Sequence, residues 1–278
     1  MKEKNDSFFG KFHLNLGDYE NVEKEYLKKV KENPLDYEAH YNLGVIYNIL
    51  GKYEEAIREF KKAIEIHPSD LLSHFNLGFL YSEFGLYEEA INEFKEAIKI
   101  NPDYVWAHYN LGNIYMNIGK YGKAIEEFKK AIKLNPNFAG AYFNLGNVYK
   151  KLGDMERAID MYEKSIELNP FDPDAHYNLG FSYKKIGNLE KAELEFKETL
   201  KLNPDYKWAH VDLFIIHISK GDTINAKRVG NALKRLDPDL WKRLSEEYGD
   251  YFSFEYSIPI FYFLPIFYFL IFHLVRIC

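Results

Sequence analysis

The chain has 278 residues, of which 47% are hydrophobic and 28% charged, and its formal net charge is -6. Acidic and basic residues are mixed along nearly every segment, so the net basic face that a nucleic-acid binder needs is missing and we expect no nucleic-acid partner. The one cysteine, Cys278, cannot form an intrachain disulfide or a cysteine-based metal cluster.

The N-terminal segment, residues 1–11, is too polar to be the apolar core of a secretory signal. We therefore expect a cytoplasmic chain.

From residue 3 to residue 240 the sequence repeats every 34 residues without insertion. Self-similarity at such a period is the signature of a repeat architecture. The predicted units are 3–36, 37–70, 71–104, 105–138, 139–172, 173–206 and 207–240.

Each unit carries one glycine and one proline at fixed positions, and these residues predict two helices separated by tight turns. The glycine supplies the left-handed residue that ends the first helix. The proline cannot donate a helical hydrogen bond and ends the second helix. The two series are Gly17, Gly51, Gly85, Gly119, Gly153, Gly187 and Gly221, and Pro34, Pro68, Pro102, Pro136, Pro170, Pro204 and Pro238.

Between these marks the apolar residues fall at helical spacing. Small residues on both helices permit close approach of the helix axes, and a large ring on the second helix fills the remaining gap. The rings are Phe60, Phe94, Phe128, Tyr162 and Phe196. The end units depart from this pattern, with Val22 in place of the small alanine in the first and Gly230 in place of the ring in the last. Residues 241–250 are predicted to form a capping helix that covers the last unit through Trp241 and Leu244.

The Leu-Gly, Tyr, Ala, Phe and Pro positions of this 34-residue period resemble the tetratricopeptide repeat family. The resemblance implies an all-α, right-handed superhelical solenoid of helix-turn-helix repeats. It also implies that the first helices line a concave face and that this face binds another protein.

On the implied concave face, one asparagine recurs in five successive units: Asn42, Asn76, Asn110, Asn144 and Asn178. An amide offers both a donor and an acceptor to the main chain of a partner, and in some family members asparagines at this position hold an extended peptide. The same asparagine is also part of the repeat consensus, so a structural role remains open.

Two further groups of residues are candidates for contact with a partner. An aromatic residue precedes each asparagine, as Tyr41, Phe75, Tyr109, Phe143 and Tyr177. These rings are either anchors for the partner or packing between adjacent first helices. Lys150 and Lys184, followed by Lys151 and Lys185, favour an acidic ligand at one end of the face. Lysines at helix C-termini also stabilise the helix dipole.

No phosphate-binding loop, zinc-protease motif, nucleophile elbow or buried cysteine nucleophile is found in the sequence. We therefore predict that the chain is not an enzyme and needs no cofactor or metal. A histidine recurs at one repeat position, as His40, His74, His108, His176 and His210. Equivalent residues on packed helices lie about 8–10 Å apart, too far to share one zinc ion, so we interpret these histidines as packing residues.

The C-terminal tail, 251–278, differs in composition from the repeats. Residues 258–275 carry no formal charge, and the hexapeptide at 259–264 is repeated at 265–270. Its length permits a membrane anchor, whereas its duplication and prolines favour a low-complexity end without function. An apolar flap on the last repeat is the third interpretation.

The predicted function is protein–protein interaction, in which the concave groove binds an extended peptide segment of a partner. The alternatives are a membrane-tethered assembly scaffold, which would require the tail as an anchor, and a targeting subunit of a separately encoded enzyme.

Overall fold

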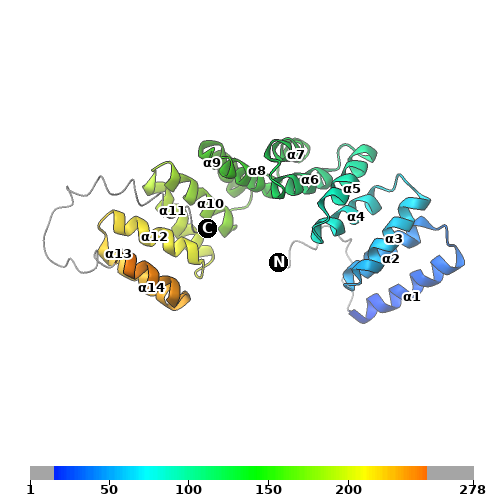
Figure 1. Ribbon diagram of the computed structural model, residues 1–278, viewed down its shortest axis with the longest axis horizontal. Coiled ribbons are helices and arrows are strands. Elements are labelled where there is room, and N and C mark those ends of the chain that lie inside the picture. The colour runs from blue at the N-terminus through cyan, green and yellow to red at the C-terminus, as the bar shows by residue number, and fades with distance from the viewer. Residues whose placement is uncertain (1–15, 249–278) are drawn as a thin grey trace. The chain divides into compact units, whose positions relative to one another are not determined.

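The computed structural model describes residues 16–248, and this part of the chain consists of fourteen helices and no strand (Figure 1). In chain order they are α1 Leu16–Glu32, α2 Tyr37–Ile49, α3 Tyr53–Ile66, α4 Leu71–Glu83, α5 Tyr87–Ile100, α6 Val105–Asn117, α7 Tyr121–Leu134, α8 Ala139–Lys151, α9 Met155–Leu168, α10 Pro173–Lys185, α11 Leu189–Leu202, α12 Lys207–Ser219, α13 Thr223–Leu236 and α14 Pro238–Glu247. The predicted all-α repeat fold is confirmed.

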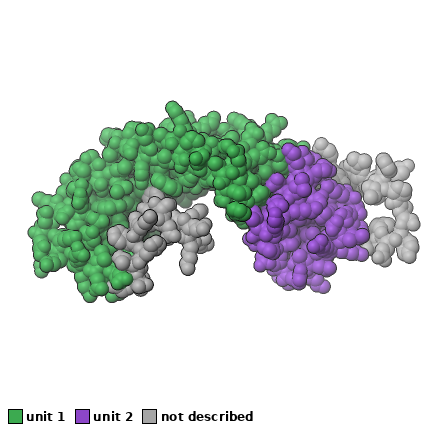
Figure 2. All heavy atoms as spheres, turned by 180° about the vertical axis from the view of Figure 1, so that it is seen from behind, with its two compact units in different colours: residues 1–186 green, residues 187–278 purple. Residues whose placement is uncertain are grey.

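The chain divides into two compact units, 1–186 and 187–278 (Figure 2). In the first unit the helices α2, α4, α6 and α8 each pack against the helix that follows, to form a pair. The second helix of each pair then packs against the first helix of the next. In the second unit, α11 packs against α12, α12 against α13 and α13 against α14.

Glycine and proline end the helices as predicted. Six turn glycines have φ between 72° and 83°: Gly51, Gly85, Gly119, Gly153, Gly187 and Gly221. A side chain in this conformation is strained, which explains the choice of glycine. The residue before the proline caps the second helix in an extended conformation, as at Asn101. Its side-chain oxygen then accepts a hydrogen bond of 3.0 Å from the Asp103 backbone N–H.

Two residues do not end helices in the way that the sequence predicted. Gly17 lies inside α1 and not in a turn, and the segment that would form a helix before it is outside the described residues. Pro238 is the first residue of α14, so this helix starts before the predicted Trp241. Proline is tolerated there because the first N–H of a helix has no intrahelical partner. Asp237 caps both the end of α13 and the start of α14.

The core of each pair is a large ring set against a glycine. The side chains of Phe60, Phe94, Phe128, Tyr162 and Phe196 are fully buried. A Cβ built on Gly112 would lie 2.8 Å from the Phe128 ring, and one built on Gly146 would lie 2.7 Å from the Tyr162 ring. Real Cβ contacts are longer, so the close approach of the two helices requires glycine at these positions.

In the pairs that carry it, the recurring histidine joins the pair to the turn before it. His74 Nδ1 lies 2.6 Å from Glu93 Oε2 on α5, and its Nε2 lies 3.0 Å from the Pro68 carbonyl oxygen. His40 contacts Glu59 and Pro34 in the same way, and His108 contacts Glu127 and Pro102. Both ring nitrogens face acceptors, and a neutral imidazole has only one N–H. At His74 this geometry favours the protonated ring, held beside the Glu93 carboxylate.

Because of the contact between His74 and Glu93, we expect the free energy of unfolding to fall as the pH rises. Burial lowers the pKa of His74, but the hydrogen bonds to Glu93 and to the Pro68 carbonyl outweigh it, so that the pKa is raised above 6.5. A raised pKa contributes stability that is complete below about 6.5 and is lost as the pH rises through the folded-state value. The melting temperature should therefore decline between about pH 6 and 8.

A Glu93→Gln variant tests this prediction, because glutamine keeps the shape of the side chain and removes the charge. Its melting temperature should change less with pH over this range than that of the natural chain. An unchanged pH slope would show that the His74 contact with Glu93 does not contribute to the dependence.

Candidate protein-interaction surface

The first helices of successive pairs form a continuous row in the first unit. α4 contacts α6, α6 contacts α8 and α8 contacts α10. Side chains on the same face of these helices therefore lie beside one another, although they are far apart in the sequence. We call this face of α2, α4, α6, α8 and α10 the first-helix surface.

The five recurring asparagines donate hydrogen bonds to other groups of this chain through their NH2 groups. In four of them Nδ2 donates to the carbonyl oxygen four residues earlier, at 2.7–2.8 Å: Asn42, Asn76, Asn110 and Asn178. Asn76 and Asn178 are buried, with 5% and 8% of their surface exposed. They therefore lack the solvent-facing orientation that contact with a partner's main chain requires. Asn42 and Asn110 are half-buried. Their Oδ1 atoms have no partner among residues 16–248.

Asn144 differs from the other four because it bridges two helices. Its Nδ2 donates to the Tyr109 hydroxyl at 3.0 Å and to Asn113 Oδ1 at 2.7 Å, both on α6. Asn147 Nδ2 lies 3.5 Å from Asn144 Oδ1, and the Tyr162 hydroxyl donates to Asn147 Oδ1 at 2.8 Å. We call Asn110, Asn113, Asn144 and Asn147 the amide cluster. All four side chains are half-buried, so the cluster reaches the surface.

The sequence prediction missed Asn113 and Asn147. The signal for them was weak, because asparagine occupies this repeat position in only these two consecutive units. The matching residues of the neighbouring units are Val45, Phe79 and Phe181.

The aromatic residues that precede the recurring asparagines pack mainly on the second helix of the same pair. The rings of Tyr41, Tyr109 and Phe143 lie 5.8–6.0 Å from the large ring of that helix. Phe75 is fully buried, with the rings of Phe94 and Tyr104 at 5.4 and 5.2 Å. It therefore has no surface to offer a partner, contrary to the candidate role that the sequence gave it. Tyr177 is half-buried.

Tyr109 belongs to an aromatic group at the turn before α8. Its ring centroid lies 4.6 Å from that of Phe138 and 6.2 Å from that of Trp106. Burial raises the pKa of the Tyr109 hydroxyl, against the opposing effect of its hydrogen bonds with Asn113 and Asn144. The hydroxyl is therefore neutral at physiological pH and serves the amide cluster as a hydrogen-bonding group.

The two candidate lysines lie at the C-terminal ends of α8 and α10. Lys150 Nζ donates a hydrogen bond to Asn178 Oδ1 on the next first helix. Burial lowers the pKa of Lys150, and the neighbouring charge of Lys151 lowers it further. Lys150 and Lys184 both place their ammonium groups near the Phe181 ring, at 5.7 and 5.5 Å from its centroid.

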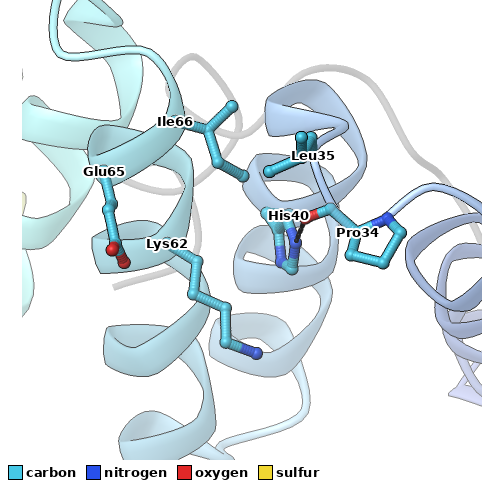
Figure 3. Close-up of a pocket in the computed structure, with 6 residues that line it drawn as sticks. All are labelled: Pro34, Leu35, His40, Lys62, Glu65 and Ile66. Atoms are coloured by element: carbon cyan, nitrogen blue, oxygen red, sulfur yellow. Dashed lines mark hydrogen bonds between the residues drawn. The ribbon is translucent and has the colours of Figure 1, made fainter.

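A pocket of about 430 Å³ lies at the turn between α1 and α2 (Figure 3). Its walls are Pro34, Leu35, His40, Lys62, Glu65 and Ile66. The His40 ring is already hydrogen-bonded through both nitrogens, and Lys62 donates to Glu59 at 3.1 Å. The pocket therefore presents a satisfied structural contact and no reactive group. Within residues 16–248, no group of His, Cys, Asp and Glu side chains is placed to hold a metal ion.

Comparison with known families gives matches along the repeats. A family model described as "TPR repeat" matches residues 82–119, 112–153 and 146–187. Two models described as "Tetratricopeptide repeat" match 37–70 and 173–206, and 59–92. Together these matches run without a gap over more than half of the chain. The chain belongs to the tetratricopeptide repeat family.

Solved tetratricopeptide repeat structures are similar to this chain. YrrB, described as "a TPR protein with an unusual peptide-binding site", is 25% identical with a TM-score of 0.59, over 66% of this chain and 95% of YrrB. MamA is 31% identical with a TM-score of 0.56, over 58% of this chain and 95% of MamA. Pseudomonas aeruginosa PilF shares the fold, at 22% identity and a TM-score of 0.66, over 76% of this chain and 97% of its own. None of the curated proteins compared with the chain matches it.

Tetratricopeptide repeats build interaction scaffolds, and the first-helix surface is the candidate interface of this one. The tail at 251–278, predicted as an anchor, a flap or a low-complexity end, lies outside the described residues. Among those that are described, no helix combines the length and the apolar character needed to cross a bilayer.

Proposed function

We propose that the chain is a non-catalytic interaction module whose first-helix surface binds an extended segment of a partner protein. The observation that carries this proposal is the amide cluster. Asn144 on α8 is hydrogen-bonded there to the Tyr109 hydroxyl and to Asn113 on α6, and Asn147 lies beside it. Asn110, also half-buried, lies one helical turn before Asn113 and donates to the Trp106 carbonyl.

Such a cluster suits the main chain of a peptide. An extended segment presents a backbone N–H and a carbonyl at each residue, and side-chain amides match both. Because the cluster is already hydrogen-bonded across two helices, little conformational entropy is lost when a peptide binds, which favours affinity. The peptide-binding site named for YrrB supports the same use of this fold.

The test is a peptide selected against the full chain from a random twelve-residue library, with its Kd measured by fluorescence anisotropy. Replacing Asn110, Asn144 and Asn147 together with alanine should weaken binding at least tenfold. Each hydrogen bond contributes about 0.5–1.5 kcal/mol, and about 1.4 kcal/mol corresponds to a factor of ten. Asn92→Ala, at an exposed site on α5, is the matched control and should leave the Kd unchanged.

The melting temperature of the same variants separates binding from structure. Asn110→Ala alone should leave it nearly unchanged, because the carbonyl that its amide contacts belongs to the α6 helix ladder. Asn144→Ala should lower it, since the link between α6 and α8 is lost. An unchanged Kd in the triple variant would rule out the amide cluster as the peptide site.

A further inference from the structure

The outer face of α13, beside α14 at the end of the array (Figure 1), is basic and carries no acidic residue. The second helices before it, α3, α5, α7, α9 and α11, carry both signs of charge, and each forms an ion pair among its own side chains. No carboxylate among residues 16–248 pairs with the charged side chains of α13, which are all exposed: Lys227, Arg228, Lys234 and Arg235. By contrast, Lys220 in the same unit pairs with Glu193 at 2.8 Å.

These four residues lie on one side of the helix together with Ile224. They follow Ile224 by three, four, ten and eleven residues, which is the spacing of a single helical face. Ile224 itself is 81% exposed. The opposite side of α13 is packed, because Gly230 and Leu233 are buried and a Cβ on Gly230 would lie 2.4 Å from the Trp241 ring of α14. We call Ile224 and the four basic residues the basic stripe.

The helix dipole accounts for only half of the charge on the basic stripe. Lys234 and Arg235 lie in the last turn of α13, where a cation is stabilised by the dipole. Lys227 and Arg228 lie in the first half of the helix, and the effect of the dipole does not extend beyond the last turn. Since they also lack a carboxylate partner, their presence points to a negatively charged group outside the described part of the chain.

The isoleucine distinguishes between the possible negative partners. The phosphates of a nucleic acid offer no apolar contact to Ile224, and α13 has no aromatic residue on which a base could stack. A bilayer that contains acidic lipids offers negative headgroups and, just beneath them, an apolar boundary in which an exposed isoleucine is buried. The basic stripe extends about 16 Å along the helix axis, and a straight face of this length can lie flat on such a surface.

The sequence after α14 supports a membrane partner. Residues 258–275 carry no formal charge and begin eleven residues after the end of this helix. They lie outside the described residues and form no part of the basic stripe. A basic patch and an apolar segment each bind membranes weakly, and stable association takes two such signals on one chain.

We infer that the basic stripe of α13 is a docking surface for the acidic headgroups of a lipid bilayer. The apolar side of α13 is used in the fold, so the charged side lies against the headgroups and Ile224 alone enters the boundary beneath them. The inference is independent of the proposed function, because the stripe and the first-helix surface share no residue.

The test is cosedimentation of the full chain with vesicles of phosphatidylcholine alone and with vesicles of phosphatidylcholine and phosphatidylserine in a three to one ratio. The ratio of the two binding constants measures the preference for acidic lipid and cancels any binding of the uncharged segment. A basic residue close to an acidic bilayer strengthens binding about fivefold. The natural chain should therefore prefer the mixed vesicles at least twentyfold, and the preference should fall as salt is added.

Replacing all four basic residues of the stripe with glutamine should abolish this preference. The matched control removes the same charge from exposed, unpaired lysines of α3, α5 and α7 and should keep the preference: Lys61, Lys95, Lys129 and Lys133. The melting temperature of the stripe variant should be nearly unchanged, because its four side chains have no partner in the fold and glutamine is a good helix former. The double variant Lys227→Gln with Arg228→Gln, which leaves the last turn intact, should lower the preference at least tenfold.

A second pair of variants tests the isoleucine. Ile224→Ser should weaken binding to the mixed vesicles several-fold, because apolar surface is no longer buried at the headgroup boundary. Leu194→Ser is the control, since Leu194 is 62% exposed on α11 and lies outside the stripe. Equal effects of the two substitutions would contradict docking through Ile224.

Three results would overturn the inference. The first is equal binding of the natural chain to both kinds of vesicle, and the second is an unchanged preference in the stripe variant. The third is tighter binding of a twenty-base-pair DNA duplex or of polyglutamate than of the mixed vesicles, through the same four residues, which would assign the stripe to a nucleic acid or to an acidic protein.

Discussion

Replacing Phe128 with alanine is expected to lower the free energy of unfolding by about 3–5 kcal/mol. The side chain is fully buried on α7, where its ring fills the space opposite Gly112 and lies 6.0 Å from the ring of Tyr109. Alanine would leave a cavity that two helices pinned at both ends by tight turns cannot close. Urea denaturation followed by circular dichroism measures the loss.

Phe171→Ala is the matched control for this substitution. Phe171 lies in the turn between α9 and α10 with 77% of its surface exposed. Its removal should change the free energy of unfolding by no more than about 0.5 kcal/mol, as for most surface substitutions. A similar loss in both variants would mean that burial at Phe128 does not set the stability of the array.

The second large effect is expected from Gly112→Ala. The added Cβ would lie 2.8 Å from the Phe128 ring, so that α6 and α7 must separate or the ring must leave its preferred rotamer. Overpacking of this kind costs about 1–3 kcal/mol. The same urea experiment should therefore show a lower midpoint for this variant.

Gly122→Ala, on the partner helix α7, should have the opposite sign. A Cβ at this position meets no atom within 4 Å. Alanine is favoured over glycine inside a helix by about 0.5–1 kcal/mol, so the variant should be slightly more stable. If both glycine variants were destabilised alike, the loss could not be ascribed to the contact with Phe128.

Helix ends and core positions were predictable from the sequence because they depend on local chemistry. A proline ends a helix because it has no N–H to donate and its ring clashes with the preceding turn. A glycine adopts positive φ without strain, so the recurring glycines and prolines predict most of the turns. Pro238 shows the limit of this reasoning. The same residue begins a helix when the chain continues directly into one, and only the packing of Trp241 and Leu244 on the last pair decides between the two outcomes.

The candidate site was less predictable because its side chains choose between several partners. The sequence could not show that Asn76 donates to its own helix while Asn144 reaches across to α6. The histidine contacts were visible in principle, since Glu59, Glu93 and Glu127 recur with the same period as the histidines. The units in which one of the two residues is replaced also indicate the contact. Where Tyr142 replaces the histidine, Met161 replaces the glutamate, and where Val229 replaces the glutamate, His210 Nδ1 is buried without a partner.

Because Tyr142 replaces the histidine, the contacts at the turn before α8 do not depend on a group that titrates near neutral pH. At the turn before α8, Tyr142 and Met161 occupy the positions of the imidazole and the carboxylate. The rings of Phe138, Tyr109 and Trp106 and neutral amides lie around this turn. None of these groups changes its charge near neutral pH, since burial raises the pKa of the Tyr109 hydroxyl. A change in pH therefore acts on the contact between His74 and Glu93 before α4. The amide contacts between α6 and α8 involve no group that titrates in this range.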